Sequence, residues 1–342
     1  MARGVTQKDI AQRLGVTQKT VSEAFSARGS AQTAVSEELR AKIIATAEAM
    51  GYRRHAAAHA LATGRFRTIA LVLGAEAVVS YVSPHFLIGL NKALAAADHL
   101  LVMASVDDQD ERLLSRLSAE HAVDGALLNW NVHIPDRLMR QAAGAMPAIW
   151  VNRMAATDCV MPDDRKAGRE ATEVLLQRGH RRIVYLDAVI AHTPDLHFSR
   201  NERIEGFRDA MREAGLQPEL MTPKLMSAQE VTESVRARLA QPDRPTALLS
   251  YAVDGGVHAA LAVERCGLQI PRDLSVMIFE EFPIGTGYDF DYMQVPFEAV
   301  GVTAAEEVLA KIEAPQRRRK TRRVPFVYVP GQTLAPPPEQ RA

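Results

Sequence analysis

Cysteine is scarce in this sequence: only Cys159 and Cys266 occur among 342 residues. Two cysteines so far apart predict reduced thiols rather than a disulfide framework, and neither has metal-site spacing. Long apolar runs are also missing, since no stretch reaches the ~18 consecutive apolar residues of a membrane span. The first residues, MARGVTQKDI, contain no apolar signal-peptide core. These absences predict a cytoplasmic protein with no metal site and no membrane partner.

Motifs typical of enzymes are absent as well. The sequence contains no GxSxG, HExxH or P-loop pattern, and its ten histidines are scattered. We interpret GG at 255–256 and GTG at 285–287 as turns rather than phosphate-binding loops. We therefore expect neither an enzyme nor a bound cofactor. A secreted solute-binding protein is a further alternative, but it would need a signal peptide.

Net charge is zero overall, yet it is unevenly distributed along the chain. Residues 1–67 carry 11 Lys and Arg against 5 Asp and Glu, whereas the remainder carries 30 against 36. We call the basic residues 1–67 the head and the acidic remainder the body. A basic head indicates that the head binds a polyanionic partner. The length and a hydrophobic content of 47% predict two or three domains with sizeable cores.

The head begins with a stretch, residues 5–25, that predicts two short helices joined by a tight turn. Thr6 and Asp9 have the spacing of a capping box, and Thr17 can cap the second helix. Gly15 ends the first helix, where a positive φ is favoured. Two helices, a glycine turn and a polar second helix are typical of a DNA-binding helix-turn-helix. Any αα-hairpin is the alternative.

A third helix and a linker follow. The third helix is predicted from Ser36 to Met50, and Gly51 ends it. Residues 53–67 are Ala-rich and basic at both ends, and they predict a linker that becomes helical when docked. Leu61 is a candidate wedge for a minor-groove step, and packing against the core is the alternative. The predicted buried stripe of the third helix consists of Leu39, Ile43, Ile44, Ala47 and Met50.

From residue 68 onward, apolar strands alternate with helices. Segments such as TIALVLG (68–74) and RRIVYLD (181–187) are nearly continuous in apolar residues. Repeated βα units of this kind predict parallel sheets covered by helices on both faces. Because there are more strands than one sheet usually holds, we expect two α/β lobes with a cleft between them. The predicted helices are 85–98, 108–121, 135–143, 166–178, 200–214, 228–240, 254–266 and 298–313, and a last strand is predicted near 324–330.

Ligands of parallel sheets bind at the carboxyl ends of the strands, so the residues there are candidate site residues. Amide, carboxylate, guanidinium and aromatic groups around a cleft suit a polyhydroxylated ligand. Taken singly, an Asn or Asp at a strand end is more often a turn former or a helix cap. The candidates are Gly74, Asn129, Trp130, Asn152, Asp254 and Glu280 after strands, with Phe86 and Arg203 on helices.

Head, linker and body together resemble LacI/GalR-type transcriptional regulators over nearly the full chain. The resemblance is carried by VTQKDIAQRLGVTQKTVS, VSEELRAKIIATAEAMGY, AAAHALATGR and TIALVLG, and in the body by VDGALL, GHRRIVYL, RIEGFRDAM and DLSVMIF. It implies an all-α helix-turn-helix headpiece (1–52), a hinge helix or linker (53–67) and a periplasmic-binding-protein-like effector domain (68–342). The implied lobes are 68–168 plus 293–325, and 169–292 plus 326–342.

The resemblance also implies a homodimeric repressor that binds a near-palindromic DNA operator under the control of a small molecule, such as a sugar. A non-sugar or corepressor ligand is the alternative. The resemblance implies that Gln18, Lys19, Ser22 and Glu23 contact the DNA bases and that Thr6, Thr17 and Thr20 contact phosphates. It implies that the hinge contacts DNA through His55, Ala58 and Leu61. Effector contacts fall on Arg203, Asn129, Asn152, Asp254 and Glu280, with Phe297 near the last.

Several positions depart from the family pattern. Glu23 stands where many members carry Arg, so it either accepts from cytosine N4 or pairs with Lys19 and reads no base. The loop after the second helix is longer than usual. Asn152 and Glu280 stand where Asp is usual, which puts a standard hexose or pentose in doubt. We expect the basic run 316–323 to be a solvated loop. The last residues lack a leucine heptad, so we expect a dimer rather than a tetramer.

Overall fold

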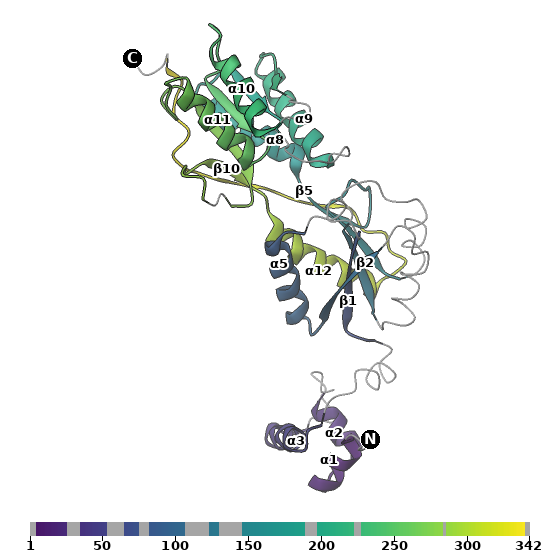
Figure 1. Ribbon diagram of the computed structural model, residues 1–342. Helices are drawn as coiled ribbons and strands as arrows, with labels where there is room; N and C mark the ends of the chain where they lie inside the picture. Colours follow the sequence, from purple (N-terminus) through teal and green to yellow (C-terminus); the bar gives the residue numbers. More distant parts are fainter. Residues whose placement is uncertain are drawn as a thin grey trace. The chain divides into compact units, whose positions relative to one another are not determined.

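The structure is a computed structural model that describes residues 5–25, 35–52, 65–74, 82–106, 123–129, 146–188, 197–221, 227–282 and 285–338. The chain forms two compact units, Met1–Phe66 and Arg67–Ala342. Figure 1 labels three helices in the first unit and the α/β elements of the second. Among the described residues, no helix is both long enough and apolar enough to cross a membrane.

The described residues of the N-terminal unit form three helices, each of which begins at a hydroxyl cap. Thr6 forms the predicted capping box with Asp9, Thr17 caps the second helix, and Ser36 caps the third. Gly15 ends the first helix with a φ of 65°, as the sequence predicts. The helices are α1 (Gln7–Leu14), α2 (Gln18–Ala24) and α3 (Glu37–Ala49).

A small apolar core holds these helices together. Ile10, Val21 and Ile43 contribute one fully buried side chain from each helix. Ile44, which we predicted in the buried stripe, is instead 38% exposed. It follows Ile43 directly and therefore lies about 100° further around the helix, away from the core. The core is small because only one narrow face of α3 contributes to it.

The first lobe of the second unit is built on a six-stranded sheet in which every described pair of strands is parallel. The sheet order is β11-β5-β4-β3-β1-β2. Helices α5 (Pro84–Ala96) and α12 (Phe297–Glu313) share one core with it (Figure 1). The strands are β1 (Thr68–Gly74), β2 (Leu100–Val106), β3 (Gly125–Asn129), β4 (Ala148–Val151), β5 (Cys159–Pro162) and β11 (Arg322–Val324).

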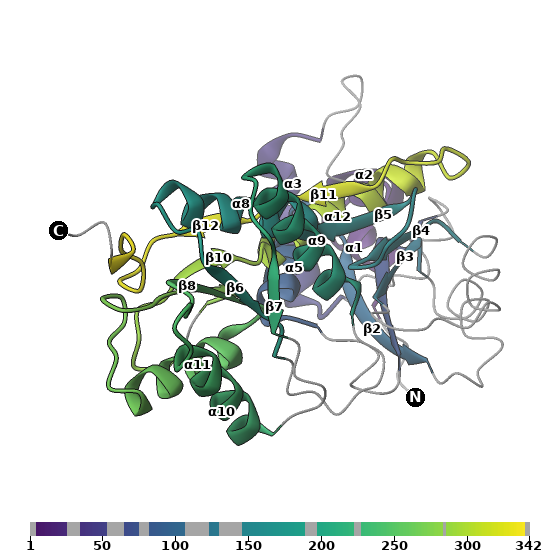
Figure 2. The ribbon, with the colours of Figure 1, turned by 90° about the horizontal axis from the view of Figure 1, so that it is seen from above.

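The second lobe contains another six-stranded sheet, in the order β12-β10-β9-β8-β6-β7. Among the described strand pairs of this sheet, only β12 is antiparallel to its neighbour. Helices α8 and α9 pack on one face and α10 and α11 on the other, since each pair joins alternate residues of the same strands (Figure 2). The helices are α8 (Asp164–Gln177), α9 (Phe198–Glu213), α10 (Ala228–Leu239) and α11 (Val253–Arg265). The strands are β6 (Ile183–Leu186), β7 (Glu219–Met221), β8 (Ala247–Ser250), β9 (Ser275–Glu280), β10 (Asp291–Gln294) and β12 (Val327–Val329).

The chain passes between the two sheets three times: after β5, after β10 and after β11. The chain leaves the first sheet before residue 168, the predicted end of the first-lobe segment, because all of α8 packs on the second sheet. It returns after residue 293, where we predicted the next first-lobe segment to begin, because β10 still pairs with β9. The last strand predicted near 324–330 is confirmed by β12 (Val327–Val329). Pro325, which has no N–H, separates it from β11, which lies in the other sheet. The helices predicted at 108–121 and 135–143 lie outside the described residues.

Candidate functional site

The second helix of the N-terminal unit presents a polar outer side. Thr17, Gln18, Lys19 and Ser22 are exposed, whereas Thr20 and Glu23 are partly buried. The Thr17 hydroxyl accepts from the Thr20 N–H at 3.1 Å and lies 2.8 Å from the Thr20 hydroxyl. Thr6 is engaged in the capping box, where its hydroxyl donates to Asp9 at 2.7 Å. The threonine hydroxyls therefore stabilise the starts of α1 and α2, and Gln18, Lys19 and Ser22 lie on the exposed side of α2.

Lys19 and Glu23 form an ion pair one turn apart on α2, with 3.9 Å between Nζ and Oε1. This position places a donor and an acceptor side by side on the outer side of the helix. The hinge candidates His55, Ala58 and Leu61 lie outside the described residues, as do Trp130 and the longer loop at 26–34.

Arg203 is the buried centre of polar contacts in the second lobe. Its Nε donates to Asp164 Oδ1 at 2.8 Å, and its Nη1 donates to the Tyr251 carbonyl oxygen at 3.0 Å. The guanidinium carbon also lies 4.7 Å from the ring centre of Phe279 and 5.3 Å from that of Phe326. Burial raises the pKa of the Asp164 carboxyl, although the Arg203 charge opposes this shift. The charge of Arg203 is thus matched inside the lobe before any ligand binds.

His197 caps α9 and connects the two lobes. Its Nε2 lies 3.2 Å from the backbone oxygen of Asn152, which can only accept, so Nε2 carries the proton. Nδ1 must then accept, from the Ser199 N–H at 3.3 Å and the Ser199 hydroxyl at 2.8 Å. The Ser199 oxygen in turn accepts from the Tyr251 hydroxyl at 2.8 Å. One directed chain of hydrogen bonds therefore runs from Tyr251 to Asn152.

A second contact joins the carboxyl ends of the two sheets. Glu281, directly after β9, accepts a hydrogen bond from the Ser83 hydroxyl at the start of α5. The Nδ1 atom of His85 lies 2.7 Å from the same carboxylate oxygen, and its ring meets Phe282 edge-on. Together with the His197–Asn152 bond, this contact places the carboxyl ends of the first sheet opposite those of the second.

The predicted strand-end candidates fall along these facing edges. Gly74 and Asn129 end β1 and β3, and the Asn129 side chain is buried. Glu280 ends β9, where burial raises the pKa of its carboxyl group. Asp254 lies exposed in the first turn of α11. Asn152 has a φ of 55° and directs its backbone oxygen toward His197 of the second lobe.

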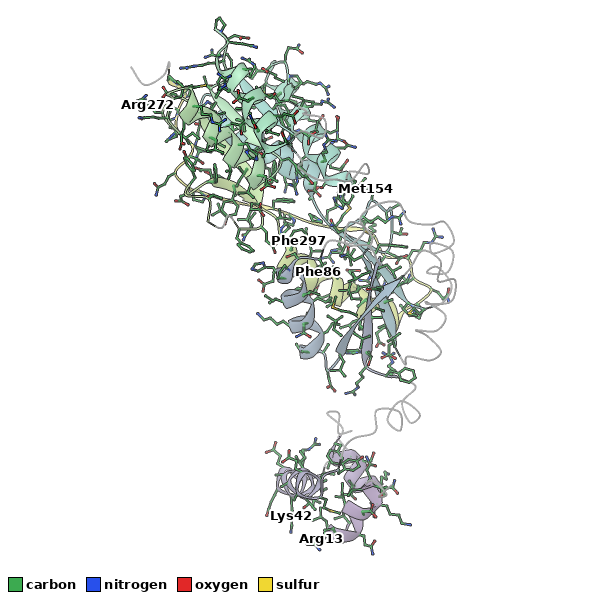
Figure 3. The ribbon with its side chains drawn as sticks, viewed as in Figure 1. Arg13, Lys42, Phe86, Met154, Arg272 and Phe297 are labelled. Carbon is green, nitrogen blue, oxygen red and sulfur yellow. The ribbon has the colours of Figure 1, made fainter. Side chains whose placement is uncertain are left out.

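Two of the three aromatic candidates, Phe86 and Phe297, lie in the described part of the chain and occupy other positions (Figure 3). Phe86 is only 2% exposed and packs in the core of the first lobe, so its ring is not presented at the strand ends. Phe297 begins α12 and packs against the cores of both lobes. It also lines a cavity of about 660 Å³ beside His85 and Glu281.

The sequence prediction missed Asp164, His197, Ser199 and Tyr251. Tyr251 directly follows β8 and therefore has the same strand-end position as the candidates. Asp164 opens α8, which we predicted to begin two residues later. His197 and Ser199 lie at the start of α9, where the polar sequence gave no periodic signal.

Acidification should destabilise the protein partly through His197. Burial lowers the pKa of His197 to about 4, from about 6.5 in an unfolded chain. Between these values the unfolded chain binds a proton that the folded chain does not, so stability is complete above pH 6.5 and is lost toward pH 4. We expect His197→Asn to remove about 2 kcal/mol of the decrease in unfolding free energy between pH 7 and pH 5. Denaturant titrations measure this difference, and equal decreases in both proteins would contradict it.

Two α/β lobes with facing carboxyl ends, preceded by a three-helix unit with a helix-turn-helix, define a class of ligand-binding DNA regulators. Residues 56–329 match the family described as periplasmic binding proteins and sugar binding domain of LacI family. The chain belongs to this family, as the sequence predicts.

Relatives match nearly the whole chain. The HTH-type transcriptional regulator GntR of Escherichia coli K12 is 27% identical over 96% of this chain and 98% of its own length. The ribose operon repressor of the same organism is 25% identical over 91% of this chain and 94% of its own length. A crystal structure of the lac repressor dimer bound to operator and an anti-inducer has a TM-score of 0.72 at 18% identity. The structural match covers 97% of this chain and 100% of the lac repressor chain, and it confirms the predicted fold class.

Proposed function

We propose that the protein is a transcriptional repressor whose affinity for a near-palindromic operator is controlled by a small molecule bound between its lobes. The proposal rests on one observation. The same chain contains α2, with its polar outer side, and two sheets whose carboxyl ends face each other. The names of its relatives, a ribose operon repressor among them, support a sugar or sugar derivative as the ligand. The residues at the facing edges that we assign to the ligand are Gly74, Asn129, Asn152, Arg203, Asp254 and Glu280.

Selection from a pool of randomised double-stranded DNA tests this function. The full-length protein should enrich a two-fold symmetric sequence, and its affinity for that sequence should fall steeply with salt because phosphate contacts release counterions. A panel of sugars and sugar acids, D-ribose and D-gluconate included, should then be tested for release of the selected DNA. Enrichment of no sequence, or a flat salt dependence, would overturn the regulator proposal.

Glu23→Gln should alter which base is selected more than it alters total affinity. A glutamate accepts from cytosine N4 and a lysine donates to guanine, so we expect the Lys19–Glu23 pair to favour one G·C position. Glutamine both donates and accepts and suits adenine, so the preference at this position should change by about tenfold or more. Competition binding to half-site variants measures the change, with Glu38→Gln on α3 as the control. Unchanged preference would mean that Glu23 only pairs with Lys19.

A homodimer is part of the proposal, and apolar side chains on the first lobe support it. Leu100 and Val102 project from the same side of β2, the edge strand of its sheet, and are 70% and 38% exposed. Ile88 of α5 is also exposed. We expect Leu100→Glu to weaken self-association at least tenfold, since an unpaired charge would be buried at the interface. Sedimentation equilibrium measures this, with Gln241→Glu in the second lobe as the control. An unchanged dimer would place the interface elsewhere.

A further inference from the structure

The contact between His197 and Asn152 has a fixed direction that sets it apart from an ordinary surface hydrogen bond. The acceptor is a backbone oxygen, so the donor can only be His197 Nε2. Every bond further along the chain then has one possible direction, as far as the Tyr251 hydroxyl. Because no bond can reverse, this network has a single complete arrangement, which requires the two lobes to be adjacent.

The first-lobe end of this network is held firmly in place. Asn152 directly follows β4, and its own N–H donates to the Val160 oxygen of β5 at 2.8 Å. Its φ of 55° is a conformation that non-glycine residues rarely adopt. This conformation turns the backbone oxygen out of the sheet and toward His197. The acceptor therefore moves only if the end of β4 moves with it.

The second-lobe end of the network is held at Tyr251. The Tyr251 hydroxyl donates to Ser199, and its backbone oxygen accepts from Arg203. The guanidinium carbon of Arg203 lies 4.8 Å from the centre of the Tyr251 ring. Tyr251 thus links the bond to Asn152 with the buried arginine of the candidate ligand site. A movement of Arg203 would reach His197 through three hydrogen bonds, those of Arg203 to Tyr251, Tyr251 to Ser199 and Ser199 to His197.

We propose that His197 is a latch residue that holds the two lobes together at their ligand-facing edges. Its Nδ1 caps α9 in the second lobe, while its Nε2–H holds the first lobe through Asn152. A ligand that displaces Arg203 or Asn152 opens the latch, and this changes how the lobes close. The link to operator release rests on the proposed function, whereas the latch itself does not.

Two substitutions separate the roles of the two ring nitrogens. In His197→Asn, the side-chain oxygen occupies the place of Nδ1, so the helix cap is kept and the bond to Asn152 is lost. In His197→Gln, the amide reaches the place of Nε2, so the bond to Asn152 is kept and the cap is lost. The readout is amide hydrogen exchange of the full-length protein without ligand, in segment 152–158 and in the first turn of α9.

We expect His197→Asn to speed exchange in segment 152–158 about fivefold, the factor that corresponds to one hydrogen bond. Exchange at the start of α9 should stay at the wild-type rate. His197→Gln should show the opposite result, with a faster first turn of α9 and a slow 152–158 segment. These opposite results cannot arise from a general loss of stability, because that would speed hydrogen exchange in both segments of both variants.

Equal behaviour of the two variants, or an unchanged 152–158 segment in His197→Asn, would overturn the latch. Its failure can be told apart from failure of the proposed function, because hydrogen exchange requires neither DNA nor ligand. If the wild-type protein selects no DNA but the variants differ as expected, only the regulator proposal fails. If DNA is selected and the variants behave alike, only the latch fails.

Discussion

Replacing Gly206 with alanine is expected to reduce the free energy of unfolding by at least about 3 kcal/mol, the upper part of the range for overpacking. A Cβ atom at this position would lie 2.0 Å from the backbone oxygen of Arg165 and 2.7 Å from the backbone nitrogen of Arg169. Both neighbours are backbone atoms of α8, so no side-chain rotation can relieve the overlap. Gly168 has the reciprocal place on α8, against the backbone of Arg203.

The whole of α9 would therefore have to move away from α8. Arg203 lies one turn before Gly206 on the same helix, so the candidate ligand site would move as well. Denaturant unfolding followed by circular dichroism measures the loss of stability. Arg212→Ala, on the exposed side of α9, is the matched control and should change stability by less than about 0.5 kcal/mol. A loss below about 1 kcal/mol for Gly206→Ala would show that the two helices tolerate separation.

Replacing Asp164 with asparagine is the second change with a large expected effect, a loss of about 3 kcal/mol or more. Asparagine keeps the shape of the side chain but removes the charge that balances Arg203. A guanidinium cannot give up its proton in a protein, so its charge would stay buried and unpaired.

Replacing the partner, Arg203, should reduce the free energy of unfolding by less than replacing Asp164. Burial already raises the pKa of the Asp164 carboxyl, so in Arg203→Met this group can take up a proton and become neutral. The double variant should consequently be more stable than Asp164→Asn alone. A double-mutant cycle in denaturant measures this coupling, and additive effects of the two substitutions would contradict it.

The N-terminal unit could be predicted from the sequence almost residue by residue. Its signals are local, since Thr6, Thr17 and Ser36 each cap a helix through a backbone N–H three residues away. Gly15 acts within a single turn. Ile44 was the exception, because apolar character alone does not say which of two adjacent residues faces the core.

The body was predicted at a coarser level. Apolar strands such as β1 and β6 were found, whereas the short strands β5, β7, β10 and β11 were missed. Three or four residues carry too little periodicity to mark a strand. These strands form through pairing with distant partners, as β11 does with β5.

The candidate site shows the same division between local and distant causes. The strand-end rule placed Asn129, Asn152 and Glu280 at the ends of strands, where the structure has them, because the end of an apolar run is visible in one sequence. Their contact with a ligand stays a prediction. Phe86, a candidate on a helix rather than at a strand end, has its ring packed in the core. The strand-end rule missed His197, whose partner Asn152 lies 45 positions earlier in the chain.

The sequence by itself determined the helix-turn-helix head, the α/β body and the family, because caps, turns and apolar periods depend on neighbouring residues. Only the tertiary structure decided which groups meet across the lobes. The directed chain from Tyr251 to Asn152 depends on where β8 and β4 end in space, and the Arg203–Asp164 pair, inside the second lobe, depends on how α9 packs against α8. No spacing in the sequence encodes those distances, so the partner of each buried charge became known only once the two sheets were in place.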